Sequence, residues 1–113
     1  MAIKHLSDEV VLVLLPKEPQ LRHELEIVNE TISNDGNYDV VIDFSQVEIL
    51  SSSSISNLLI LHNLLCEHGR KLILSNVALP TRGLLNVAGL EGFFSYADDK
   101  YVALERLQHP IGR

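Results

Sequence analysis

Four consecutive serines, Ser51 to Ser54, are the residues of this chain whose type and spacing best fit a chemical role. They stand between a strand-like run that ends near Leu50 and a helical apolar pattern that begins at Ile55. Backbone amides at the start of a helix have no intrahelical partner, so a serine there suits capping, anion binding or attachment of a phosphate. The serine run is therefore the primary candidate site.

Enzymatic use of these serines has little support. A nucleophilic serine usually sits in a glycine-flanked elbow with a base and an orienting acid, and Ser51 to Ser54 have no glycine neighbour. A glycine-rich phosphate loop is also missing from the sequence. The five histidines show no metal-ligand spacing. We expect no catalytic residue, no metal and no cofactor.

The composition indicates one globular domain over residues 1–113, because a chain that is 46% hydrophobic can build one core of this size. A formal charge of -6, with nine dispersed Lys and Arg residues, argues against nucleic-acid binding. No apolar run approaches the roughly 20 residues that cross a bilayer, and the N-terminus lacks a secretion signal. We expect a cytoplasmic protein without direct membrane insertion. Cys66 lies in an apolar helical stretch and is expected to be buried and inert.

Apolar residues follow two patterns that alternate along the chain, one typical of strands and one typical of helices. Strands are expected at Val10 to Leu15, Tyr38 to Phe44, Lys71 to Val77 and Phe93 to Tyr96, with a short paired run at Ile3 to Leu6. The VVLVLL run suits a strand buried on both faces. Helices are expected from Leu21 to about Asn34, from about Ser53 to Glu67, from Pro80 to Gly89, and after Asp99. The alternation predicts an α/β fold, in which a mixed sheet of four to five strands packs against about four helices.

The residues around the serine run follow a recognisable motif. An apolar strand leads into Asp43, Phe44, Ser45 and Val47, and then into the apolar pair Ile49 and Leu50. Further along stand Pro80, Arg82, Leu85, Gly89, Leu90 and Phe94. This pattern resembles the STAS domain, the fold of bacterial anti-sigma factor antagonists, over roughly Tyr38 to Leu107. The family usually continues the apolar pair with Asp-Ser-Ser-Gly, where this chain has Ser51 to Ser54.

The resemblance implies a phosphorylation switch. Ser52 occupies the position that a partner kinase modifies in phosphorylatable members of the family. The implied protein binds an anti-sigma factor, which is a serine kinase, through Ser51, Ser52, Ser53, Ser54 and Asn57, and thereby frees a sigma factor. The kinase then phosphorylates Ser52, and a serine phosphatase resets it. The chain itself would not be an enzyme.

Alternatives remain open from the sequence. The same fold also serves as a scaffold that is not phosphorylated, or as an accessory subunit of a membrane transporter, and there the serines only cap the helix and contact a partner. For Ser51 and Ser53 capping is the commoner role, whereas the family register favours phosphorylation at Ser52. Asp43 either orients the serine loop or caps it.

Overall fold

A five-stranded mixed sheet organises the part of the chain that the computed structural model describes, residues 3–108. The two ends of the predicted 1–113 domain lie outside these residues. The strands are β1 (Ile3–His5), β2 (Val10–Leu14), β3 (Asp39–Asp43), β4 (Leu72–Ser75) and β5 (Ser95–Ala97). The helices are α1 (Gln20–Asn34), α2 (Ser52–Glu67), α3 (Leu79–Val87) and α4 (Lys100–Gln108), with a 3-10 turn η1 at Glu91–Phe93. The predicted α/β class, the number of strands and the number of helices are confirmed.

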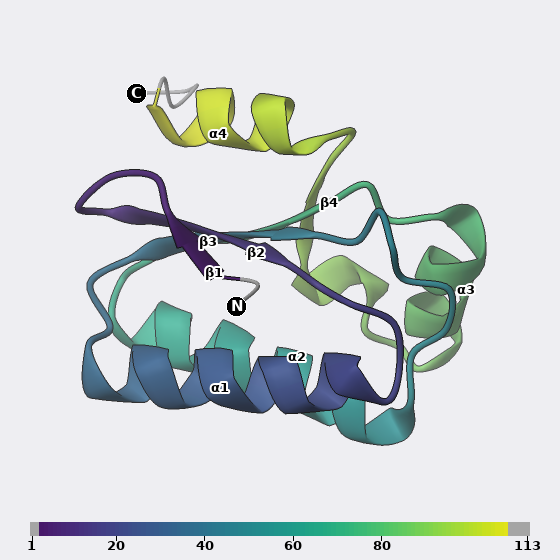
Figure 1. The fold of residues 1–113 in the computed structure, drawn as a ribbon. Helices are drawn as coiled ribbons and strands as arrows, with labels where there is room; N and C mark the ends of the chain where they lie inside the picture. The colour runs from purple at the N-terminus through teal and green to yellow at the C-terminus, as the bar shows by residue number, and fades with distance from the viewer. Residues whose placement is uncertain (1–2, 109–113) are drawn as a thin grey trace.

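The strands lie in the order β1-β2-β3-β4-β5, and only the β1–β2 pair is antiparallel. Parallel neighbours need crossover connections, which here are helices laid against the sheet. Figure 1 shows α1 and α2 beneath one face of the sheet and α4 over the other. The carboxyl ends of β2, β3 and β4 therefore meet at one edge.

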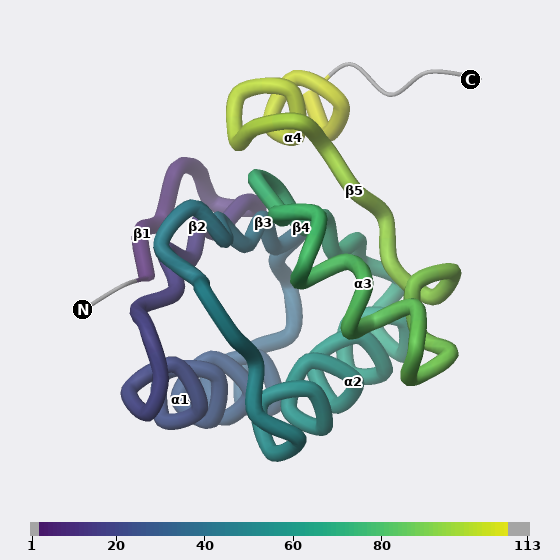
Figure 2. The backbone as a smooth tube through the Cα atoms, turned by 90° about the vertical axis from the view of Figure 1, so that its right-hand side faces the viewer, coloured from purple at the N-terminus to yellow at the C-terminus, as the bar shows by residue number. Residues whose placement is uncertain are grey.

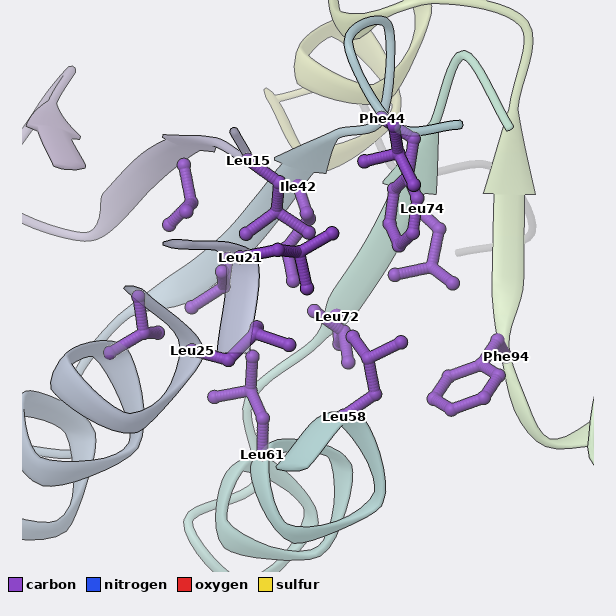
Figure 3. Close-up of a cluster of buried hydrophobic side chains, with 14 of the residues drawn as sticks. Leu15, Leu21, Leu25, Ile42, Phe44, Leu58, Leu61, Leu72, Leu74 and Phe94 are labelled. Atoms are coloured by element: carbon purple, nitrogen blue, oxygen red, sulfur yellow. The ribbon is translucent and has the colours of Figure 1, made fainter. Parts of the chain in front are cut away.

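The main core fills the space between the sheet and the pair α1 and α2 (Figure 3). Leu21 and Leu25 of α1 face Leu58 and Leu61 of α2, and all four side chains are fully buried. A smaller cluster, formed by Val41, Ile73 and Ala103, lies under α4. The helical periodicity of the sequence thus identified the inner face of α1 correctly.

The second face of the sheet is less covered than the sequence suggested. Val11 and Val13 are buried, but Leu14 is 37% exposed, so the prediction that β2 is buried on both faces was wrong. The reason is the short α4, which packs against β3, β4 and β5 and leaves the outer face of β2 partly open.

The prediction of a buried Cys66 was also wrong, because α2 buries only one stripe of its surface. Leu61 and Leu65 face the core, whereas Ile60 is 48% exposed and Cys66 is exposed. In α3 the same holds for Leu85, which is buried, and Leu84, which is 43% exposed. A mostly apolar helix need not be covered all round.

Replacing Leu61 by Ala should lower the free energy of unfolding by about 2–5 kcal/mol, because it leaves a cavity in the main core. The neighbouring substitution Ile60→Ala is the matched control and should cost about 1 kcal/mol or less, since this side chain is 48% exposed. Urea denaturation of both variants measures the difference. Equal losses would contradict the packing described for α2.

Candidate functional site

The candidate site lies where β3 gives way to α2, at the edge that collects the carboxyl ends of the parallel strands. Figure 2 faces this edge, and the chain from β3 to α2 crosses the front of the view. The loop from β2 to α1 reaches the same edge. Residues far apart in the sequence can therefore meet at the serine run.

Ser51 is the N-cap of α2. Its backbone is extended (φ -75°, ψ 162°), and its Oγ accepts a hydrogen bond of 3.1 Å from the amide of Ser54. The Ser51 carbonyl accepts the amide of Ile55 at 3.0 Å. This geometry satisfies one of the unpaired amides of the helix start, and it confirms the capping role predicted for Ser51. The helix begins at Ser52, one residue before the predicted start.

A carboxylate from another loop completes the junction. Glu18, in the loop between β2 and α1, accepts hydrogen bonds from the Ser51 amide at 2.8 Å and from the Ser54 hydroxyl at 2.7 Å through the same oxygen, Oε2. A negative charge at a helix N-terminus is favourable because it faces unpaired amides and the positive end of the helix dipole. Glu18 thus ties the start of α1 to the start of α2.

The hydrogen bonds at Glu18 also change its acidity. Partial burial alone would raise the pKa of this carboxyl, but the hydrogen bonds from the Ser51 amide and the Ser54 hydroxyl outweigh burial and lower the pKa below its usual value. Glu18 is therefore ionised at neutral pH. The sequence did not indicate this role for Glu18, because its contact with Ser51 spans 33 residues. The available signal was an acidic residue in the loop after β2, four residues beyond the end of a strand that ends at the same edge.

The four serines do not share one environment. Ser52 and Ser53 are exposed, and their hydroxyls make no hydrogen bond within residues 3–108. Ser54 is fully buried, with its hydroxyl donating to Glu18, so it cannot touch a partner directly in this conformation. Only Ser51, Ser52 and Ser53 are at the surface.

Two other predicted residues lie beside the run but act inside the fold. The Nδ2 of Asn57 donates to the Ser53 carbonyl at 3.0 Å, and its Oδ1 accepts the Nδ2 of Asn29 at 3.2 Å, so Asn57 joins α2 to α1. Asp43 accepts the amide of Ser45 at 2.8 Å and caps the turn after β3. Within residues 3–108 Asp43 makes no hydrogen bond to Ser51 to Ser54, which favours the capping role over orientation of the serine loop.

Other kinds of site have little support in residues 3–108. No group of three or more His, Cys, Asp or Glu side chains within that range is arranged to hold a metal ion. Among the same residues, no helix combines the length and the apolar character that spanning a membrane requires.

An exposed apolar residue, Ile49, flanks the serine junction with 64% of its surface accessible.

The sequence model of the STAS domain matches residues 7–103, most of the chain. The chain belongs to the STAS domain family. The resemblance to the STAS domain is thereby confirmed, and the match extends toward the N-terminus from Tyr38 to Ser7, so that it includes β2. No curated protein matches the sequence.

Several solved structures share this STAS fold. The anti-sigma factor antagonist SpoIIAA in its unphosphorylated form has 16% identity and a TM-score of 0.75, with 95% of this chain and 96% of SpoIIAA covered. RsbS of Moorella thermoacetica has 19% identity and a TM-score of 0.80, with 94% and 92% covered. A sulfate transporter family protein of Wolinella succinogenes has 20% identity and a TM-score of 0.65, with 92% and 90% covered. At these identities the similarity shows a common fold.

Replacing Ser51 by Ala should lower the free energy of unfolding by about 0.5–2 kcal/mol, because the Ser54 amide loses its cap. Ser53→Ala is the matched control: its hydroxyl makes no hydrogen bond in the described residues, and it should change stability by about 0.5 kcal/mol or less. Thermal or urea unfolding followed by circular dichroism measures both. A larger effect at Ser53 would show that the cap is misassigned.

Glu18→Gln should destabilise the protein in a pH-dependent way. Because the folded pKa lies below the usual value of 4.5, the ionised carboxylate stabilises the fold above that pH, and this contribution is lost as the pH falls through the folded pKa. At pH 7 the loss should be about 1.5–3 kcal/mol, the range for hydrogen bonds to a charged group.

The control for this prediction is Glu48→Gln, which replaces a glutamate whose side chain is 72% exposed and pairs with the exposed Lys17 at 3.6 Å. Urea unfolding of the wild type and of both variants between pH 3 and pH 7 gives the difference curves. The loss of unfolding free energy caused by Glu18→Gln should fall toward zero near pH 3. The loss caused by Glu48→Gln should stay near zero at every pH. A Glu18 curve that is flat with pH would refute the role of the ionised carboxylate.

Proposed function

We propose that this STAS domain is an anti-sigma factor antagonist, in which Ser52 is the phosphorylation switch. The protein binds an anti-sigma factor that is a serine kinase, and this binding frees a sigma factor in the cytoplasm. The kinase phosphorylates Ser52, and a serine phosphatase removes the phosphate. The observation that carries the proposal is a division within the serine run. Ser51 and Ser54 hydrogen-bond to Glu18, whereas Ser52 and Ser53 are exposed and their hydroxyls make no hydrogen bond within residues 3–108. Of these two, Ser52 has the family position of the modified serine.

The start of α2 can hold a phosphate without unfolding. The amide of Ser54 is capped and that of Ser51 is bonded to Glu18, but the amides of Ser52 and Ser53 have no hydrogen-bond partner among the described residues. A phosphate on Ser52 adds about -1.5 to -2 charge next to these amides and the positive end of the helix. The helix start compensates part of this charge, so the fold survives modification.

The same phosphate would weaken partner binding. It places charge and tightly bound water on the surface formed by Ser51, Ser52, Ser53 and the exposed Ile49. Like charges brought together across an interface cost several kcal/mol, and a desolvated phosphate adds to that cost. In this proposal Ser54 and Asn57 support the surface from inside, through Glu18 and Asn29.

A second function is favoured by one comparison. A sulfate transporter family protein carries the same fold, and the family acid and glycine around Ser52 are replaced here by Ser51 and Ser54. In that case the protein is a scaffold or accessory subunit of a membrane transporter, and the serines are not modified. Affinity purification from the native cell separates the two functions, because it recovers either a serine kinase or transporter subunits.

Incubation with the anti-sigma kinase of the same organism and ATP should add one phosphate, located at Ser52 by mass spectrometry. Ser52→Ala should abolish the modification, and Ser53→Ala, the matched control, should retain it. Ser52→Asp should weaken binding of the kinase about tenfold or more, equivalent to roughly 1.4 kcal/mol. Calorimetry or surface plasmon resonance measures this affinity.

A kinase that is active on another substrate but leaves Ser52 unmodified would rule out the switch. Circular dichroism of each variant provides the folding control, since Ser52 and Ser53 are exposed and neither substitution should change the melting temperature by more than a few degrees.

A further inference from the structure

A second site lies away from the serine junction, beside the C-terminal half of α2. A cavity of about 360 Å³ opens there between α2, the start of β4, η1 and the end of α4. It exists because β5 pairs with β4 only from Ile73 onward, so the preceding residue, Leu72, begins the strand without an outer neighbour. Figure 2 shows β5 leading up to α4, on the opposite side of the sheet from α2. The size is within the range of about 300–1,000 Å³ typical of small-molecule sites.

The lining of this cavity is largely apolar. The apolar residues that border it are Leu65, Leu72, Ile73, Phe93 and Leu107. The first three are already buried in the fold, so Phe93 and Leu107 offer most of the apolar surface that a ligand could cover. Phe93 is 56% exposed, so its ring is accessible to a ligand in the cavity. A hydrocarbon chain or ring placed here would cover this surface.

The charged residues of the cavity are all of one sign. Arg70, Lys71 and Arg106 line it, three of the nine Lys and Arg residues of the chain, and none of the fifteen Asp and Glu residues does. In a protein with a formal charge of -6, this concentration of cations selects for an anion.

Two of these cations have no ion-pair partner among the residues that the structure describes. The Nε of Arg70 lies 3.2 Å from Asp39, in an ion pair without hydrogen-bond geometry, and its Nη1 lies 3.6 Å from Glu9. Lys71 makes no ion pair within residues 3–108, and Arg106 donates only to the Tyr96 carbonyl, at 2.9 Å. Lys71 and Arg106 are thus available for an acid group at the mouth of an apolar cavity.

We propose that this cavity binds a medium-chain carboxylate, a single-tailed anionic amphiphile. The hydrocarbon tail covers Phe93 and Leu107, and the carboxylate faces Lys71 and Arg106. Apolar contact supplies most of the affinity, and the two cations discriminate between head groups. Because both cations are exposed, the discrimination weakens as the salt concentration rises.

The test titrates the ¹⁵N-labelled full chain with octanoate, 1-octanol and octylamine, three probes with the same tail. At low salt, octanoate should shift the amide signals of Leu72, Phe93 and Leu107 and bind about tenfold more tightly than octanol, with octylamine weakest. Lys71→Gln combined with Arg106→Gln should reduce the octanoate affinity to that of octanol. Arg22→Gln, which removes an exposed cation of α1, is the matched control and should change nothing.

Cys66 offers an independent measurement, because its exposed thiol lies in the lining of the cavity. Octanoate should slow alkylation of Cys66 by iodoacetamide in the wild type, at the concentrations that shift the amides. If the double variant does not fold, the proposal is still tested on the wild type, by the affinity ranking of the three probes and by the protection of Cys66 from alkylation. Equal affinity for octanoate and octanol, shifts confined to other regions, or an unprotected Cys66 would each overturn the proposal.

Discussion

Parallel pairing of β2, β3 and β4 is the constraint on which the rest of the structure depends. The register sets Val13 beside Ile42 and Ile42 beside Leu74, so all three strands run the same way and end at the same edge. After each of these strands the chain must cross a face of the sheet to reach the start of the next strand. Helices make these crossings and therefore cover the sheet. The loop that carries Glu18 and the loop that carries Ser51 are adjacent for this reason alone.

The serine junction shows how a departure from a family motif can be accommodated. The STAS pattern has an acid and a glycine where this chain has Ser51 and Ser54, and these are the two serines that hydrogen-bond to Glu18. A carboxylate is therefore present at the helix start, although it comes from a different loop. Since successive helical residues turn by about 100°, Ser54 faces inward while Ser52 remains outside. The junction combines a rigid inner part with a free outer hydroxyl.

The predictions that succeeded and those that failed have different physical origins. Leu21, Leu25 and Ile32 repeat with the helical period, and a polar opposite face marks the inner side, so their burial could be predicted. Leu14 lies in a continuous apolar run, where no period distinguishes the covered side from the open one. Cys66 lies in a helix that is mostly apolar, so its own apolar character did not show that it faces outward. Their exposure depends on how far neighbouring helices extend.

By itself, the sequence determined the α/β class, the order of strands and helices, the STAS family and the helix start at the serine run, because these depend on local periodicity, capping chemistry and motif. The tertiary structure decided which serines are free, brought Glu18 to the helix start and set Lys71 and Arg106 around one cavity. These features join residues that are distant in sequence. Their contacts arise only when strand pairing and helix packing place separate loops together, which no local pattern encodes.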